Sequence, residues 1–384
     1  MIKFVNKLIG IYTLNIYTTG KSDCSHTKRA TIRDVQEENK YMTFRERAIK
    51  SLGIFPQKVP PEMKIEREQK FSDCTGYVIS YNLEENERTR SILLKPESAS
   101  AKTPAARQDN APANAKSKIS AAPHESLQTK LPAVLAIHQH NGEFHLGKAE
   151  PAAWDINGKI PQLNPMYAYG RDLVAKGYVA LCPDLLCFEE RFDPHFGKAQ
   201  DTSAGASHEI FEFTKRVQHG SSLQAKYLHD MSVAIDILCS LDYVDTSRIG
   251  VIGHSLGGQT SLYTTWYDTR VKAGVSSCGF GTMETIINNK INHNKAMYIP
   301  GFSVYADTYD ILCDIAPRAF AFTSGIKDDI FPIDGVRIIE EKAKKQYASL
   351  DAPDKLLTHI FNGGHSFDNE AKQKVYSFID RELK

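Results

Sequence analysis

Apolar and amphipathic segments alternate from residue 132 to the C-terminus, and this alternation constrains the fold more than any other feature. Short apolar runs predict strands, and longer runs with apolar residues every three or four positions predict helices. Repeated strand, helix, strand order predicts an α/β fold, in which helices cover both faces of a mostly parallel sheet. The expected strands are residues 132–137, 178–182, 248–252, 271–276, 318–323 and 356–361, and the expected helices are residues 166–176, 223–241, 256–266, 333–348 and 369–383.

The N-terminal part predicts a different strand arrangement. Three strand-like segments cover residues 63–68, 74–81 and 90–94. The segments between them are too short for parallel crossovers, so we expect antiparallel strands that lead into the sheet. We expect residues 1–61 to form an N-terminal extension with a short helix over residues 43–52, and residues 62–384 to form one α/β domain.

Three segments interrupt or border this pattern. Residues 96–130 are rich in Ala, Ser, Pro, Lys, Asn and Gln and contain no aromatic residue, so they cannot bury enough apolar surface to offset their ordering entropy, and we expect a disordered insertion. Residues 279–317 form a long excursion between two expected core strands, which predicts a lid over the site; the alternative is that they only cover the sheet. Residues 201–220 are polar and contain Gly and Ser, which indicates a second, mobile rim.

The composition narrows the class of partner. The chain has 47 basic and 46 acidic residues, a net charge of +1, so it lacks the charge expected of a protein that binds nucleic acid or an anionic membrane. It has no run of about 18 apolar residues, so no membrane span is expected. Its seven cysteines show no paired spacing, which favours free thiols in a reducing, cytoplasmic compartment. We therefore expect a small-molecule substrate.

A glycine-rich turn supplies the candidate nucleophile. The residues Gly253-His254-Ser255-Leu256-Gly257-Gly258 follow an expected strand and precede an expected helix, which is the context of a nucleophile elbow. The glycines allow a turn so tight that side chains would collide with neighbouring backbone, and Ser255 is then presented above the sheet edge. A phosphate-binding turn is the alternative, but the lysine of a phosphate loop is missing.

A serine hydroxyl needs a base, and the base needs an acid that fixes its tautomer. His365 lies in a glycine-rich loop between the last expected strand and the last expected helix; the alternative is that it only caps that helix. Asp328 follows the strand over residues 318–323 and is our choice for the acid, with Asp329 and Asp184 as rivals. The chain order Ser255, Asp328, His365 is the order of α/β hydrolases.

Two backbone amides are needed for the oxyanion of the tetrahedral intermediate. The first is that of Leu256, and the second lies in residues 138–142, where we favour His140 over Gln139. His138 and His140 are also compatible with zinc, but no third ligand is suggested nearby, so we expect no metal and no other cofactor. The expected substrate pocket contains Gln139, His254, Met297 and Tyr298, with packing as the alternative role of His254.

Together, residues 138–142, 253–258, 325–332 and 363–367 resemble those of dienelactone-hydrolase-like and acetyl-xylan-esterase-like α/β hydrolases, over residues 132–384. Similar proteins carry stretches like His145-Leu146-Gly147-Lys148 with Glu150-Pro151, and like Phe188-Glu189-Glu190-Arg191. The resemblance implies ester hydrolysis through an acyl-enzyme, without a cofactor. Dienelactone hydrolases proper use a cysteine at the elbow, whereas this chain has Ser255, which makes dienelactone itself a doubtful substrate.

The sequence therefore predicts a serine hydrolase of the carboxylesterase type (EC 3.1.1.-) that acts on a small or medium ester. A serine peptidase and an acyltransferase are alternatives, because both use the same fold and triad. A binding scaffold without activity is a third alternative, and it would require a misaligned triad.

Overall fold

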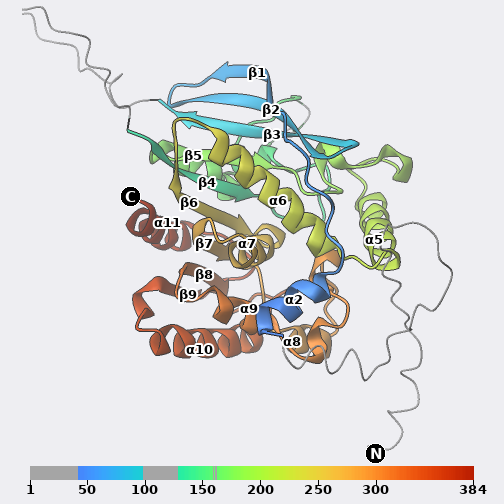
Figure 1. Ribbon diagram of the computed structural model, residues 1–384, viewed down its shortest axis with the longest axis vertical. Coiled ribbons are helices and arrows are strands. Elements are labelled where there is room, and N and C mark those ends of the chain that lie inside the picture. Colours follow the sequence, from blue (N-terminus) through green and yellow to red (C-terminus); the bar gives the residue numbers. More distant parts are fainter. Residues whose placement is uncertain (1–41, 98–128, 159, 161) are drawn as a thin grey trace, which may run out of the picture. The chain divides into compact units, whose positions relative to one another are not determined.

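The computed structural model describes residues 42–97, 129–158, 160 and 162–384 (Figure 1). Its contacts divide the chain into two units, Met1–Ser51 and Leu52–Lys384. Helix α2 (Phe44–Leu52) begins in the first unit. The Thr43 hydroxyl accepts from the amide of Glu46 (3.2 Å), and the Glu46 carboxylate accepts from the amide of Thr43 (2.7 Å). This reciprocal capping box explains why the helix begins there.

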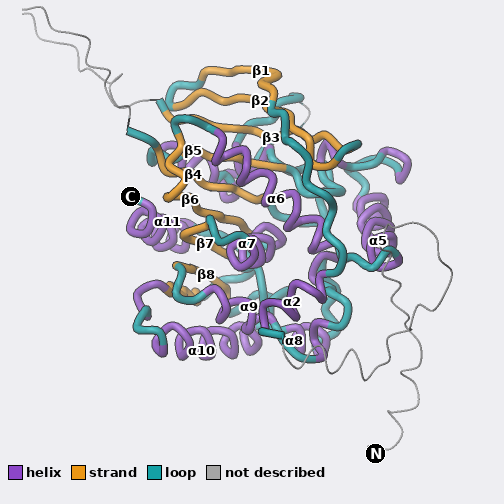
Figure 2. The backbone as a smooth tube through the Cα atoms, in the orientation of Figure 1, coloured by secondary structure: helices purple, strands orange, loops and turns teal. Residues whose placement is uncertain are grey.

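The second unit is built on a nine-stranded sheet with the order β1-β2-β3-β5-β4-β6-β7-β8-β9. Strands β4 to β9 are parallel to their neighbours within this set, whereas β1, β2 and β3 are antiparallel and β3 joins β5 in antiparallel pairing. In Figure 2 the three antiparallel strands lie together at the top. The predicted architecture is confirmed. The strands are β1 (Lys64–Lys70), β2 (Cys74–Glu84), β3 (Glu87–Pro96), β4 (Leu131–Ile137), β5 (Val179–Pro183), β6 (Val244–His254), β7 (Val271–Ser277), β8 (Ala319–Gly325) and β9 (Leu356–Phe361).

Helices cover both faces of the sheet because successive side chains of a strand point to opposite faces. In β4, Leu135 belongs to one apolar cluster, together with Tyr227 and Met231 of α6. Its neighbour Val134 belongs to the other cluster, with side chains of α4 and α11. The helices are α3 (Ala149–Ala152), α4 (Tyr169–Ala175), α5 (Thr202–Gln218), α6 (Leu223–Ser240), α7 (Leu256–Tyr267), α8 (Met283–Asn288), α9 (Thr308–Ile315), α10 (Ile333–Ser349) and α11 (Asn369–Leu383). The 3-10 turns are η3 (Pro165–Tyr167), η4 (Glu189–Arg191), η5 (Pro194–Phe196), η6 (Lys295–Met297), η7 (Phe302–Val304) and η8 (Pro353–Lys355).

Helix α5 is the main element that the sequence pattern missed. The polar segment expected as a mobile rim forms a helix of 17 residues, whose first turn is capped by the Asp201 carboxylate through the amide of Ser203 (2.9 Å). Its buried positions include His208, Glu209 and Glu212, so the usual apolar periodicity is absent. An apolar pattern could not have predicted a helix that buries polar side chains.

Of the two expected insertions, the structure describes the one between β7 and β8, but only the ends of the one between β3 and β4. The excursion between β7 and β8 contains α8, α9, η6 and η7. Most of the insertion expected over residues 96–130 lies outside the described residues. Within the described part, the six cysteines are free thiols, and none of its helices has the length and apolar character required to cross a membrane.

Candidate active site

The turn between β6 and α7 holds Ser255 in a conformation that non-glycine residues rarely adopt. Its φ is 54° and its ψ is −118°. A Cβ atom on Gly253 would lie 2.3 Å from the carbonyl of Gly257, and one on Gly257 would lie 2.0 Å from the carbonyl oxygen of Ile137. Only glycine fits at either position. The strained turn therefore presents Ser255 at the carboxyl end of the sheet, as the elbow pattern predicts.

His365 and Asp328 meet at the same edge of the sheet. His365 lies in the loop between β9 and α11, and its Nδ1 is 2.8 Å from Oδ2 of Asp328, which follows β8. Because the carboxylate accepts at Nδ1, that nitrogen carries the proton and Nε2 is left to accept one. The pair has the geometry of a general base and the acid that orients it.

The environment of Asp328 keeps its carboxylate ionised. Its Oδ1 accepts from the backbone amides of Ile330 (2.9 Å) and Phe331 (3.0 Å). Burial alone would raise the pKa of Asp328, but His365 and these two donors outweigh burial and lower the pKa below its ordinary value. An ionised Asp328 stabilises the imidazolium that forms when His365 accepts a proton.

Among the described residues, the carboxylate that pairs with His365 is that of Asp328 and not that of either rival. Asp329 is exposed. Asp184 is buried, and its two oxygens accept from the backbone amide and the ammonium group of Lys148, each at 2.6 Å. Of the three candidates, the structure brings Asp328 to His365.

The loop after β4 passes directly beside the elbow. Gly257 of the elbow packs closely against the carbonyls of Ile137 and His138, so the start of this loop lies next to the elbow. Leu256 is the first residue of α7, so its N–H has no acceptor within the helix and stands next to Ser255. His140 follows two residues after His138 on the same loop. Leu256 thus directly follows the nucleophile, and His140 lies on the loop that passes beside the elbow; their role as oxyanion donors stays a prediction.

His138 has a packing role in this loop. Its Nδ1 lies 2.8 Å from the carbonyl oxygen of Gln139, and its Nε2 accepts from the amide of Leu185 at 3.0 Å. Burial lowers the pKa of His138 to about 4, so the ring is neutral and both nitrogens are used. The cluster of three possible metal ligands found among the described residues consists of Cys278, Asp328 and His365, and it does not include His138.

Gln139 and His254, two of the residues expected in the substrate pocket, are both buried. The Nε2 of Gln139 is 3.3 Å from Oε2 of Glu150, and burial raises the pKa of Glu150 to about 7. The buried ring of His254 is stacked on Tyr167, with 4.9 Å between the centroids, and lies 4.8 Å from the ring of His365. Burial lowers the pKa of His254 well below its ordinary value. His254 therefore packs as a neutral ring behind His365.

Met297 and Tyr298 lie in the insertion between β7 and β8, as expected, but they face a hollow that none of the three triad candidates lines. The hollow has a volume of about 170 Å³. Its other lining residues are Phe213, Met283, Ile287, Ile299, Pro300, Phe302 and Ser303. Their assignment to the substrate pocket stays a prediction.

The structure adds residues that the sequence did not single out. His293, from the insertion, donates a hydrogen bond from Nε2 to the carbonyl oxygen of Ile330 (2.8 Å), and its ring stacks on that of Phe331 with 4.5 Å between the centroids. The thiol of Cys278 lies 3.4 Å from the carbonyl oxygen of Ser366, next to the catalytic loop. No spacing in the sequence relates His293 to the loop of Asp328, because the contact joins segments that are distant along the chain.

The motifs around Lys148 and Arg191 build a buried network of charges. The ammonium group of Lys148 pairs with Asp184 (2.6 Å), Glu189 (2.8 Å) and Glu190 (3.0 Å). Burial would lower the pKa of Lys148, but these carboxylates raise it above its ordinary value. Such a group of pairs is costly to break, because each partner would be left as an uncompensated buried charge. The network therefore fixes the loops that follow β4 and β5.

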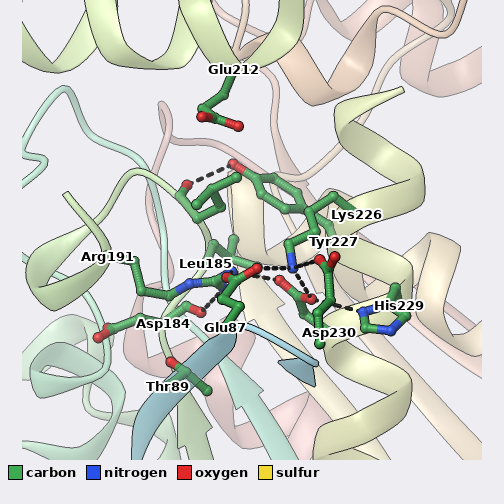
Figure 3. A network of polar contacts seen from close by, with 12 residues as sticks. Glu87, Thr89, Asp184, Leu185, Arg191, Glu212, Lys226, Tyr227, His229 and Asp230 are labelled. Atoms are coloured by element: carbon green, nitrogen blue, oxygen red, sulfur yellow. Dashed lines mark hydrogen bonds and ion pairs between the residues drawn. The ribbon is translucent and has the colours of Figure 1, made fainter. Parts of the chain in front are cut away.

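A second part of the network reaches the antiparallel strands. Figure 3 shows the guanidinium of Arg191 between Glu87 and Asp230, with Lys226 beside them. Arg191 pairs with Glu87 at 2.5 Å and with Asp230 at 2.8 Å, and Lys226 pairs with Glu87 at 2.6 Å. These contacts join the start of β3, the loop after β5 and helix α6.

Comparison with known proteins shows the family of the chain. The model of the dienelactone hydrolase family matches residues 155–380. A curated relative, "Putative hydrolase YtaP" of Bacillus subtilis (strain 168), is 29% identical over 254 residues, which cover 66% of this chain and 79% of the relative.

Solved structures show the same fold at low sequence identity. A "putative acetyl xylan esterase" from Bacteroides fragilis NCTC 9343 has a TM-score of 0.61 and 17% identity, covering 85% of this chain and 76% of that one. The glucuronoyl esterase from Solibacter usitatus has a TM-score of 0.56 and 13% identity, covering 90% and 94%. Because the family model spans more than half of the sequence, the chain belongs to the dienelactone hydrolase family of α/β hydrolases.

Proposed function

We propose that the protein hydrolyses a carboxylic ester, with Ser255 as the nucleophile, His365 as the general base and Asp328 as the acid that orients it. The observation that carries this proposal is the hydrogen bond of 2.8 Å between His365 Nδ1 and Asp328 Oδ2, at the sheet edge where the strained turn presents Ser255. Membership of a hydrolase family supports the class of reaction.

The reaction proceeds in two steps. Ser255 Oγ attacks the carbonyl carbon of the ester while its proton passes to Nε2 of His365, and the oxyanion accepts hydrogen bonds from the amides of Leu256 and His140. The alcohol leaves with the proton from His365, and an acyl ester remains on Ser255. Water then attacks this ester, again with His365 as the base, and releases the carboxylic acid.

A small or medium ester is the substrate class that we favour. The similar solved structures are named as a putative acetyl xylan esterase and a glucuronoyl esterase. In addition, an ester releases an alcohol, so the site needs no groups that assist the departure of an amine. A peptidase or an acyltransferase would use the same acyl-enzyme and differ in the leaving group or the acceptor. No cofactor enters the steps above. A cytoplasmic location remains part of the proposal and rests on the free thiols of the described residues.

The test is hydrolysis of p-nitrophenyl esters of increasing acyl length by the wild type and by Ser255→Ala. The variant should lose at least about 10⁴-fold in kcat, and a fluorophosphonate should add one adduct to the wild type and none to the variant. Ser207→Ala, which changes an exposed serine of α5, is the matched control and should behave as the wild type. Full turnover by Ser255→Ala would refute the assignment, and p-nitroanilide substrates and added alcohols would distinguish the peptidase and acyltransferase alternatives.

A further inference from the structure

Helix α5 brings a buried carboxylate to the loop that holds the expected oxyanion donor. Glu209 is 3% exposed. Its Oε2 lies 3.6 Å from Nε2 of His140, and its Oε1 accepts from the backbone amide of Lys295 at 3.0 Å. Glu209 thus contacts both the loop after β4 and turn η6 of the insertion.

The hydrogen bonds around His140 define which nitrogen carries the proton. Nδ1 accepts from the backbone amide of Gly142 at 3.0 Å, so the neutral ring carries its proton on Nε2. That nitrogen is buried and has no hydrogen-bond partner within normal distance among the described residues. The Nε2–H group of the His140 ring therefore faces the negatively charged carboxylate of Glu209, at a distance slightly longer than a normal hydrogen bond.

Aromatic rings hold the imidazole of His140 on its other sides. Its ring meets those of Phe144 and Phe188 edge to face, with centroid distances of 4.8 and 5.1 Å. With Gly142 at one nitrogen and Glu209 at the other, the ring has one defined orientation. The orientation of the ring in turn constrains the backbone of the same residue.

The neighbouring acid on α5 shows what a purely structural pairing looks like in this helix. Glu212 lies one turn later and pairs with Arg216 and Lys215. Glu209 has no such cation within the described residues, where its recorded ion-pair partner is His140. Burial of a carboxylate is unfavourable without compensation, so an apolar residue would serve packing better at position 209.

We propose that Glu209 is a positioning residue, which orients His140 and thereby aims the His140 amide at the oxyanion. The inference rests on the proposed function. The same carboxylate binds the amide of Lys295, so it also ties the oxyanion loop to the insertion between β7 and β8. Removal of the tie would affect the transition state more than substrate binding, because the oxyanion forms only after the attack of Ser255.

The first test is Glu209→Gln, which keeps the shape of the side chain. A glutamine has one acceptor oxygen for two donors, the His140 ring and the Lys295 amide, so its NH₂ group must face a donor. We expect kcat to fall about 10-fold or more while KM stays within about twofold, and a trifluoromethyl ketone inhibitor, which forms an oxyanion on Ser255, to bind correspondingly more weakly. Glu212→Gln on the same helix is the matched control and should leave kcat unchanged.

A double-mutant cycle with His140→Ala tests whether Glu209 affects kcat through the side chain of His140. If Glu209 acts through His140, Glu209→Gln should have almost no further effect on kcat in the His140→Ala background. Additive losses, or a kcat within twofold of the wild type for Glu209→Gln, would overturn the proposal. Should Glu209→Gln unfold, Glu209→Asp provides the same comparison, since its shorter carboxylate cannot reach both partners.

Failure of this inference is separable from failure of the proposed function. If Ser255→Ala remains active, the function is wrong. If Ser255→Ala is inactive but Glu209→Gln keeps the wild-type kcat with a normal melting temperature, only the role of Glu209 is wrong.

Discussion

Two adjacent carboxylates follow β8, and only one of them reaches His365. The sequence limited the acid to Asp328, Asp329 or Asp184, because all three follow strands of the sheet. It favoured Asp328 but left Asp329 open as a rival, since the direction of each side chain depends on the backbone of the loop. In the structure the amides of Ile330 and Phe331 hold Asp328 toward His365, and Asp329 is exposed.

Asp328→Asn should therefore be far more damaging than Asp329→Asn. The asparagine NH₂ group would favour the wrong tautomer of His365, and such a change in a serine triad lowers kcat by about 10⁴-fold. Asp329→Asn should stay within about twofold of the wild type in the hydrolysis of p-nitrophenyl acetate. The reverse order of the two variants would show that the loop is arranged differently in solution.

The residues to which we assign the chemistry could be proposed from the sequence where local context decides their place. Ser255 lies in a turn with strand before and helix after, and His365 lies in a loop with the same kind of flanks. Glu209 was not predictable, because its contact with His140 joins residues 69 positions apart through the packing of a helix. A contact between residues so far apart along the chain produces no motif that a single sequence could show.

At the scale of elements, the regular periodicity predicted the strands and helices of the core, and it failed at α5. Most helices here bury an apolar face, whereas α5 buries His208 and Glu209 and leaves Ile210 and Phe211 about half exposed. The element is nevertheless fitted closely to the site: a Cβ atom on Gly205 would lie 1.8 Å from the ring of Phe144, and Phe144 packs on His140.

We expect Gly205→Ala to destabilise the protein, although alanine normally stabilises a helix relative to glycine by about 1 kcal/mol. The added methyl group would overlap Phe144, which has no free space because it is fully buried, and overpacking of this kind costs about 1–3 kcal/mol. Denaturant unfolding measures the loss, and kcat should fall with it as the oxyanion loop shifts. Ser207→Ala on the exposed side of the same helix is the control; equal or greater stability of Gly205→Ala would contradict the fit of α5 against the loop.

At the scale of the whole molecule, the direction of the strands separates the catalytic edge from the opposite edge. Leu94 of β3 pairs with Ala180 near the start of β5, and β5 runs parallel to β4. The end of β3 and the start of β4 therefore lie at the amino edge of the parallel strands, whereas Ser255 and Asp328 follow their carboxyl ends. The sequence predicted the parallel sheet, but the strand order is a property of packing that periodicity does not contain.

We therefore expect that the segment between β3 and β4 can be replaced without effect on catalysis. Strands β3 and β4 flank β5, so their ends are separated by two strand spacings, or about 10 Å. A Gly/Ser linker of about eight residues spans this distance easily. A chain with such a linker in place of residues 98–128 should keep the kcat and KM of the full chain for p-nitrophenyl esters. A folded variant with lost activity would show that this segment takes part in the reaction.

The close contact of Gly257 with the carbonyls of Ile137 and His138 has a consequence for how such an enzyme can change. It makes the nucleophile and the loop beside it one rigid block of backbone, which no side-chain substitution at the contact can loosen without a clash. The outer part of the excursion between β7 and β8, which lines the hollow at Met297 and Tyr298, is attached to this block from outside. Selection can therefore reshape that part to accept new substrates while the residues to which we assign the chemistry are inherited unchanged.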